Sequence, residues 1–222
     1  MISAVIPAYN EEKFIGEVVE KAKKFVDEVI VVDDCSTDRT AEVAMQSGAK
    51  VIRNEKNLGK AKAIKKGLEE ARGEIIVMLD ADMQHDPEDI PKLVEPLLNY
   101  NADVVLGSRF LLKGEKSPIL RFLSNKINRF IVSKLAGRKV TDSECGYRAI
   151  RKDVLKEIDL NEKRFNIEPY IIIQASLKGY KIIEVPVKKI YGMEKSTVKK
   201  RDILYRLYFY IKMWVRKRRG KI

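Results

Sequence analysis

Hydrophobic residues in the first half of the chain fall into short continuous runs that alternate with stretches of helical period. The runs have the length of buried strands, and between them apolar residues recur at every third or fourth position. The pattern predicts strands at 2–6, 29–32, 50–53, 75–79 and 102–106, and helices at 11–25, 38–46, 60–71 and 87–99, the last with Pro87 at its start.

Continuous apolar strands that alternate with helices are typical of a mainly parallel sheet covered on both faces. The predicted fold class is therefore α/β. Ligands of such sheets bind beyond the carboxyl ends of the strands. Polar clusters come directly after four of the five predicted strands, so we expect them at one edge of the sheet, at 9–11, 33–34, 80–84 and 108–109.

The alternation stops after residue 109. Residues 117–137 contain a predicted helix, a turn-rich stretch runs to Arg148, and a helix at 167–177 precedes a last strand at 181–187. The end of the chain has a helical apolar period. We predict a single catalytic domain over 1–197. The tail over 198–222 is not expected to form a separate domain.

Positive charge is concentrated at the end of the chain. The net charge is +12, and from residue 195 onward eleven Lys and Arg face one acid, Asp202, which gives +10 and leaves +2 for the other 194 residues. A basic, aromatic-bearing amphipathic helix predicts peripheral binding to a membrane surface. The segment 119–135 has a similar pattern, although packing on the sheet explains it equally well. The aromatic and basic tail also fits binding to single-stranded nucleic acid, but the nearly neutral body with its acidic clusters speaks against it.

Composition excludes several other classes. Cys35 and Cys145 form no CxxC pair and His85 is the only histidine, so we expect reduced thiols, no structural zinc and no Ser/His/Asp triad. We expect the His85 side chain to be solvated beside the 80–84 turn. No basic leader precedes the first apolar run, and no apolar stretch reaches about 20 residues, so neither a signal peptide nor a spanning helix is predicted.

Asp80 and Asp82 come after a buried strand and are two residues apart. Paired carboxylates can share a hard divalent cation such as Mg²⁺ or Mn²⁺, with open positions for substrate phosphates. Gln84 places an amide oxygen nearby. The alternative is an Asp-rich turn that only leads into a helix.

Two further polar segments have a ligand interpretation and a structural one. Asp33 and Asp34 can accept hydrogen bonds from a ribose or base, or cap the helix predicted at 38. The segment 57–60 can present backbone N–H groups and Lys60 to a phosphate, or start a helix with Asn57 as its cap.

Three arginines of the second half, Arg109, Arg121 and Arg148, are candidates for bidentate phosphate binding. The alternative for each is a surface arginine, and that alternative is strongest for Arg121, which lies among other cations on a predicted helix.

Several segments, in the order in which they occur, resemble the motifs of family 2 glycosyltransferases. They are IPAYNE at 6–11, VVDDCSTDRT at 31–40, NLGK at 57–60, DADMQH at 80–85, GSR at 107–109, DSECGYRA at 142–149 and KIYGMEK at 189–195. The last two resemble elements of the polyprenyl-phosphate branch, which includes the dolichyl-phosphate mannose synthases.

The resemblance implies a GT-A fold and an inverting transfer from a nucleotide-sugar to dolichyl or polyprenyl phosphate, with GDP-mannose as the expected donor and Mg²⁺ or Mn²⁺ as the cofactor. By motif position, the nucleotide-sugar site would comprise Pro7, Tyr9, Glu11, Val32, Asp34, Ala81, Lys189 and Lys195. The metal ligands would be Asp80, Asp82 and Gln84. Arg109 and Arg148 join the two aspartates as catalytic candidates, and Arg121 and Ser124 would meet the acceptor phosphate.

The chain departs from these motifs at four positions. Cys35 replaces a Gly, Cys145 a Ser, Lys189 an Arg and Glu194 a Ser. The sugar and the acceptor are therefore less well defined than the fold.

A lipid phosphate is already an anion and needs no strong general base, which fits a chain with one histidine. A sugar hydroxyl as acceptor would need a carboxylate base, for which Glu144 and Asp142 are the candidates. The alternative function is transfer from a UDP-sugar to a lipid or saccharide acceptor. We expect the enzyme on the cytoplasmic face of the membrane, with no nucleic-acid partner.

Overall fold

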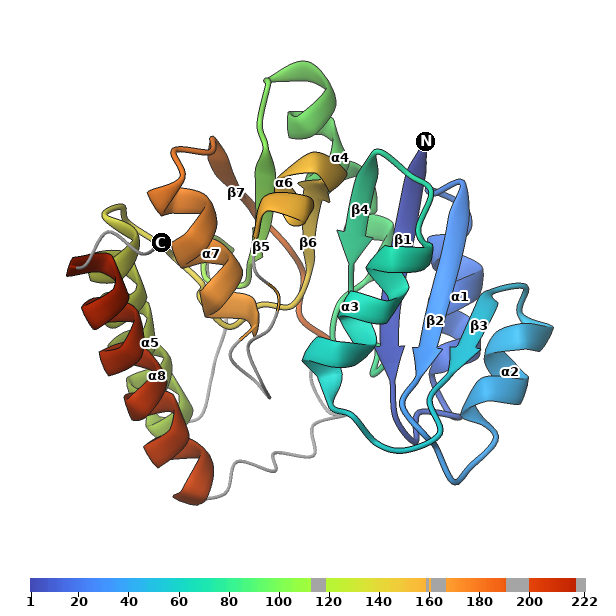
Figure 1. The fold of residues 1–222 in the computed structure, drawn as a ribbon. Coiled ribbons are helices and arrows are strands. Elements are labelled where there is room, and N and C mark those ends of the chain that lie inside the picture. The colour runs from blue at the N-terminus through green and yellow to red at the C-terminus, as the bar shows by residue number, and fades with distance from the viewer. Residues whose placement is uncertain (113–118, 159, 161–166, 191–199, 219–222) are drawn as a thin grey trace.

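The computed structural model describes residues 1–112, 119–158, 160, 167–190 and 200–218. Its centre is a seven-stranded sheet in the order β3-β2-β1-β4-β6-β5-β7 (Figure 1). The strands are β1 (Ile2–Ala8), β2 (Glu28–Asp33), β3 (Lys50–Arg53), β4 (Ile75–Met78), β5 (Val104–Ser108), β6 (Arg148–Arg151) and β7 (Ile182–Pro186). The predicted strands are therefore all present, within two residues at each end.

One strand runs against the other six. β6 pairs antiparallel with both β4 and β5, whereas β1, β2, β3 and β4 pair in parallel and β5 pairs in parallel with β7. The sequence-based prediction ended a turn-rich stretch at Arg148 and missed both β6 and the short helix after it. β6 has only two apolar residues between two arginines, so its strand character comes from its place between β4 and β5.

Helices cover both faces of the sheet (Figure 1). They are α1 (Ile15–Ala22), α2 (Thr40–Gln46), α3 (Lys60–Glu70), η1 (Pro87–Asp89), α4 (Ile90–Asn99), α5 (Ile119–Ala136), α6 (Lys152–Glu157), α7 (Ile167–Leu177) and α8 (Lys200–Arg218). One hydrophobic core joins the sheet to α3, α5, α6, α7 and α8, and the other joins it to α1, α2 and α4. β1 supplies both, because successive side chains point to opposite faces: Val5 lies in the first core and Ile6 in the second.

The last helix is part of the first core. α8 lies beside α5 (Figure 1) and buries Phe209, Tyr210 and Met213. Its opposite side leaves four large apolar side chains exposed, namely Leu207, Tyr208, Ile211 and Trp214. Among the described helices, none is both long enough and apolar enough to cross a bilayer.

Candidate active site at the carboxyl edge of the sheet

The four polar clusters lie at or just beyond the carboxyl ends of β1, β2, β4 and β5. The register aligns Ala8 with Asp33, so the segments after β1 and β2 leave the sheet side by side. Tyr9 is about half exposed at this edge, whereas Val32 is fully buried. Val32 was expected to bind the nucleotide-sugar and can do so only through its backbone. Ala81, expected at the same site, is also buried.

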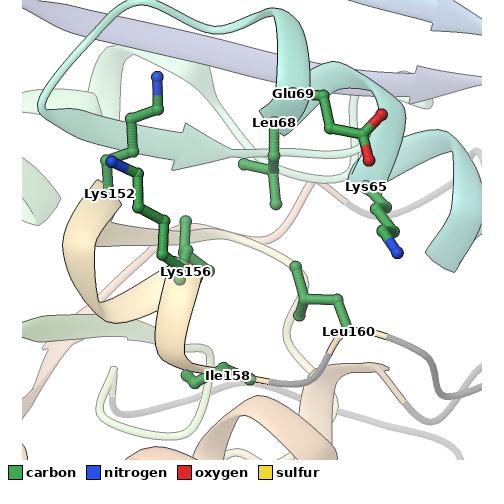
Figure 2. A pocket seen from close by; sticks show the side chains of 8 residues that line it. Lys65, Leu68, Glu69, Lys152, Lys156, Ile158 and Leu160 are labelled. Atoms are coloured by element: carbon green, nitrogen blue, oxygen red, sulfur yellow. The ribbon is translucent and has the colours of Figure 1, made fainter.

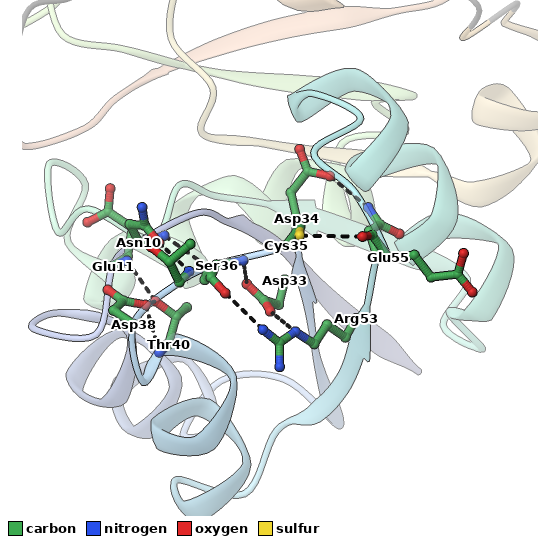
Figure 3. A network of polar contacts seen from close by, with 12 residues as sticks. Asn10, Glu11, Asp33, Asp34, Cys35, Ser36, Asp38, Thr40, Arg53 and Glu55 are labelled. Atoms are coloured by element: carbon green, nitrogen blue, oxygen red, sulfur yellow. Dashed lines mark hydrogen bonds and ion pairs between the residues drawn. The ribbon is translucent and has the colours of Figure 1, made fainter.

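The loops after β1 and β2 hold each other by hydrogen bonds (Figure 3). The Asn10 N–H donates to Ser36 Oγ at 2.9 Å, the Thr37 N–H donates to Asn10 Oδ1 at 2.8 Å, and the Glu11 N–H donates to Thr40 Oγ1 at 2.8 Å. Ser36 and Thr37 therefore serve this junction and do not cap α2. Helix α2 starts at Thr40, later than predicted.

Cys35 has a backbone φ of +67°. This left-handed conformation favours glycine, which explains why the motif that this segment resembles has Gly at the position. The Cys35 thiol contacts the Glu55 carbonyl oxygen at 3.5 Å (Figure 3). The loop after β2 therefore has room for a cysteine side chain where the motif has glycine.

Asp34 ties the loop before α3 to β2. Its carboxylate accepts hydrogen bonds from Asn54 Nδ2 and the Leu58 N–H, each at 2.8 Å, and from the Gly59 N–H at 2.7 Å. The backbone N–H groups that we expected to meet a phosphate are thus directed at a carboxylate, and the N-cap of α3 is Gly59 instead of Asn57. The neighbouring Asp33 pairs with Arg53 at 3.1 Å and does not cap α2 (Figure 3).

The two carboxylates of the 80–82 turn have different surroundings. Asp80 Oδ1 lies 2.6 Å from Lys60 Nζ, and although burial acts to raise the pKa of Asp80, Lys60 and other nearby cations hold that pKa below the usual range. Burial and the Asp80 charge raise the pKa of Asp82, whose oxygens accept hydrogen bonds from the Gln84 N–H and side-chain amide. Two adjacent half-buried carboxylates that repel each other form a site that a divalent cation would stabilise.

Lys60 is not free to bind phosphate in this arrangement. Its Nζ also lies 2.7 Å from Glu168 Oε1 on α7, so one ammonium bridges two carboxylates. Burial acts to lower the pKa of Lys60, but the two carboxylate charges outweigh it and raise that pKa above its ordinary value. Sequence reasoning missed Glu168, although it is the one charged residue in the otherwise uncharged segment 167–177.

Arg109 makes a bidentate ion pair with Asp142. Arg109 Nε lies 2.6 Å from Asp142 Oδ2, and Nη2 lies 2.9 Å from Oδ1. The guanidinium fork that we expected on a substrate phosphate is thus engaged by a carboxylate, and Asp142 is buried and paired. Of the two base candidates, Glu144 is the more available: Oε2 pairs with Arg206 of α8 at 3.1 Å, and its buried Oε1 has no hydrogen-bond partner.

Arg148 lies inside the protein, at the start of β6 and opposite Met78, the last residue of β4. Its side chain is 1% exposed and donates hydrogen bonds to the carbonyl oxygens of Cys145 and Glu168. The expectation that Arg148 meets anionic substrate is therefore replaced by a structural role, because its hydrogen-bonding groups join the 142–147 segment to the start of α7.

Replacing Arg148 should cost stability, contrary to the sequence-based expectation that its loss would act mainly on activity. Arg148→Ala removes the buried side-chain donor shared by the carbonyl oxygens of Cys145 and Glu168 and opens a cavity, together roughly 3–5 kcal/mol. We expect thermal unfolding to show a melting temperature lower by about 10 °C. Arg72→Ala, which removes an exposed arginine, should melt like the wild type; equal melting of both variants would contradict this role.

His85 is buried, and the prediction of a solvated side chain was wrong. Its Nε2 lies 3.4 Å from Cys145 Sγ and its ring packs against Tyr147. Burial lowers the pKa of His85 to about 4 and raises the pKa of Cys145 to about 12. Both are therefore neutral at pH 7. A backbone bridge joins His85 to Lys189, which brings the segment after β7 to the acidic turn.

The remaining predicted residues lie at the end of β1, on α5 or outside the described residues. Ser124 is exposed on α5, which also includes position 121. The Arg121 side chain and Lys195 lie outside the described residues. Pro7 and Glu11 are half-buried at the end of β1.

Two pockets are lined by residues outside the acidic turn. One, of about 490 Å³, lies between α3 and α6 and is lined by apolar side chains together with lysines and Glu69 (Figure 2); it contains none of the predicted site residues. The other, of about 900 Å³, is next to Arg109 and is lined by Phe110, Leu111, the second half of α5 and residues 137–141.

Comparison with known proteins decides the family. The family model described as glycosyl transferase family 2 matches residues 3–159. The chain belongs to glycosyl transferase family 2. It is therefore a glycosyltransferase, and both the resemblance in its motifs and the predicted GT-A type of α/β fold are confirmed.

Relatives of this family 2 glycosyltransferase include enzymes that act on lipid phosphates. A dolichol-phosphate mannosyltransferase of Pyrococcus furiosus is 37% identical over 83% of this chain and 55% of its own length. A UDP-N-acetylglucosamine–dolichyl-phosphate N-acetylglucosaminyltransferase of Methanococcus voltae is 35% identical over 86% of both chains. Among solved structures, glucosyl-3-phosphoglycerate synthase of Mycobacterium tuberculosis in complex with Mn²⁺, UDP and phosphoglyceric acid has a TM-score of 0.73 and 26% identity, covering 92% of this chain and 73% of its own.

Proposed function

We propose that this glycosyltransferase moves a sugar from a nucleotide-sugar to a polyprenyl or dolichyl phosphate at a membrane surface. The observation that carries the proposal is the acidic turn at the carboxyl edge: Asp80 and Asp82 share that edge with Arg109, next to which a basic and apolar groove starts at Phe110. The names of the relatives from Pyrococcus furiosus and Methanococcus voltae support a lipid phosphate as acceptor.

The residues of the turn fit Mg²⁺ or Mn²⁺. Asp80, Asp82 and the amide oxygen of Gln84 offer hard oxygen ligands. The described residues contain no group of three His, Cys, Asp or Glu that could hold a metal, so the carboxylates at this turn number two. A cation held by one or two carboxylates plus substrate phosphates fits that donor set. When bound, such a cation neutralises charge on the leaving diphosphate. The structure of the mycobacterial synthase in complex with Mg²⁺ and UDP supports the assignment.

The reaction we propose is a single in-line displacement. An oxygen of the acceptor phosphate forms a bond to the anomeric carbon of the sugar, the bond from that carbon to the diphosphate breaks, and the nucleoside diphosphate leaves with the bonding electrons. The configuration at the anomeric carbon is inverted. The acceptor is already anionic, so no base is needed, which agrees with a buried neutral His85 and an Asp142 that Arg109 occupies.

The groove beside Arg109 suits an anion with an apolar chain. It combines Phe110, Leu111 and Phe130 with five cations of α5 and the adjoining loop, Lys126, Arg129, Lys134, Arg138 and Lys139. Arg129 also lies 5.8 Å from the Phe110 ring centroid. Phosphate binding by cations and contact of the lipid chain with aromatic side chains would both be served here.

The exposed faces of α5 and α8 are the proposed membrane contact. Ile127 and Phe130 of α5 are exposed, as are the four large apolar side chains on the outer side of α8. Exposed cations such as Lys126, Lys134 and Lys217 accompany them. Together they would place the groove near the headgroups on the cytoplasmic face, where anionic lipids attract basic helices.

GDP-mannose is the donor that we propose, and a UDP-sugar is the second candidate. The Pyrococcus relative is named for mannose transfer, whereas the Methanococcus relative is named for UDP-N-acetylglucosamine and the mycobacterial synthase binds UDP. A screen of GDP- and UDP-sugars with Mn²⁺ and polyprenyl phosphate separates the two. Release of GDP from GDP-mannose supports the first; turnover of UDP-sugars alone contradicts it.

A further inference from the structure

Glu168 lies where the proposed function gives it no assigned task. It is a carboxylate 7% exposed, in the first turn of α7, and its Oε1 contacts Lys60 Nζ at 2.7 Å. The same ammonium contacts Asp80 Oδ1 at 2.6 Å. The three groups therefore form a chain that runs from the interior to the first carboxylate of the acidic turn.

The other oxygen of Asp80 faces Gly146. A Cβ at position 146 would lie 2.8 Å from Asp80 Oδ2 and 3.0 Å from Lys60 Nζ. The backbone of the 142–147 segment thus packs directly against the carboxylate, and a side chain there would displace it. Lys60 and Gly146 both lie against the Asp80 carboxylate, so its orientation is determined by neighbours that are not themselves metal ligands.

Arg148 supports the far end of the chain. Its Nη1 donates to the Glu168 carbonyl oxygen at 3.0 Å, and another of its nitrogens donates to the Cys145 carbonyl oxygen, next to Gly146. One buried arginine therefore holds together the two segments that enclose Asp80. This arrangement has the form of an outer shell that orients a metal ligand.

We propose that Glu168 is a positioning residue for the divalent cation, acting through Lys60 on the orientation of Asp80. The inference rests on the proposed function, in which Asp80 is a metal ligand. Without the Glu168 carboxylate, the Lys60 ammonium would no longer be anchored from the interior, so it would not fix the orientation of Asp80. It would also add uncompensated positive charge beside the cation. Both effects weaken cation binding.

The test is the affinity of the full chain for Mn²⁺, measured without turnover. The electron paramagnetic resonance signal of free Mn²⁺ gives this affinity in two separate titrations, one with UDP present and one with GDP present. Glu168→Gln should weaken Mn²⁺ binding by about 10–100-fold, as loss of an outer-shell partner does. Glu69→Gln, the same change at an exposed position of α3, should bind Mn²⁺ like the wild type. Melting temperatures should show that both variants are folded.

Two further variants separate positioning from net charge and from misfolding. Lys60→Met combined with Glu168→Gln restores the net charge but leaves Asp80 without its orienting partner, so binding should remain weak; recovery of wild-type affinity would overturn the proposal. Gly146→Ala places a Cβ within 3.0 Å of both Asp80 Oδ2 and Lys60 Nζ, leaves Glu168 in place and should also weaken Mn²⁺ binding. The double variant, which leaves no unpaired ammonium beside position 168, keeps the test decisive if Glu168→Gln alone does not fold.

The role of Glu168 and the proposed function fail on different results. Equal Mn²⁺ affinity of folded Glu168→Gln and the wild type, or of the Lys60→Met/Glu168→Gln double variant and the wild type where Glu168→Gln alone does not fold, would overturn the role of Glu168 alone. Absence of Mn²⁺ binding by the wild type with either nucleotide would overturn the metal assignment of Asp80 as well.

Discussion

Asp82→Ala should lower the transfer rate by about 10³-fold, because loss of a metal ligand removes several kcal/mol of stabilisation of the charge on the leaving diphosphate. The fold should survive, because the Asp82 side chain is half-buried and its carboxylate oxygens accept hydrogen bonds from the neighbouring Gln84. Initial rates at saturating donor, with a melting curve for each protein, provide the measurement.

A nearby carboxylate serves as the control. Glu88 is exposed on η1, and Glu88→Ala should keep wild-type turnover. Asp80→Ala should also abolish transfer, but it removes the partner of Lys60 and is less easily interpreted. Near wild-type turnover of purified Asp82→Ala at saturating donor would show that the metal assignment is wrong.

Paired substitution of Ile211→Ser and Trp214→Ser should weaken binding to anionic vesicles by roughly 100-fold. Each exposed apolar side chain that leaves the interface costs about 1.5 kcal/mol of binding free energy. The substitutions spare the buried face of α8, where Phe209, Tyr210 and Met213 pack. Truncation after Lys200 would remove these core residues and destabilise the domain, so point variants report on the membrane more cleanly. Vesicle co-sedimentation at low and high salt is the measurement.

The matched control replaces two exposed apolar side chains by serine on the other face of the sheet. Met45 and Leu98 are exposed on α2 and α4, and their replacement by serine should leave vesicle binding unchanged. High salt should weaken the binding of the wild-type protein, because cations near an anionic surface are screened. Equal vesicle binding by the Ile211/Trp214 variant and the wild type would exclude α8 as the contact.

The sequence predicted the elements whose own pattern is strong. β3 and α7 have the predicted bounds, and the carboxyl-edge clusters lie where the strand alternation placed them. β6 was missed because a four-residue segment with two arginines has no strand period, and only its neighbours β4 and β5 make it a strand.

The candidate site was predicted less completely. The partner that a side chain meets from a distant segment cannot be deduced from the hydrophobic and polar pattern around that residue. Arg109 and Arg148 were expected to bind substrate, yet Asp142 engages one and the interior encloses the other. His85 was placed beside the correct turn but in the wrong environment. Glu168 was missed because only the folded chain brings α7 to Lys60.

The central claim is sugar transfer onto a lipid phosphate, and the most direct measurement traces a labelled sugar. The full chain is incubated with the labelled nucleotide-sugar, Mn²⁺ and polyprenyl phosphate, and the organic phase is counted. We predict label in the organic phase that disappears with EDTA, returns with excess Mn²⁺ and is absent when polyprenol replaces its phosphate. Label that stays in water with polyprenyl phosphate but appears on an added saccharide, or transfer that EDTA does not affect, would contradict the account.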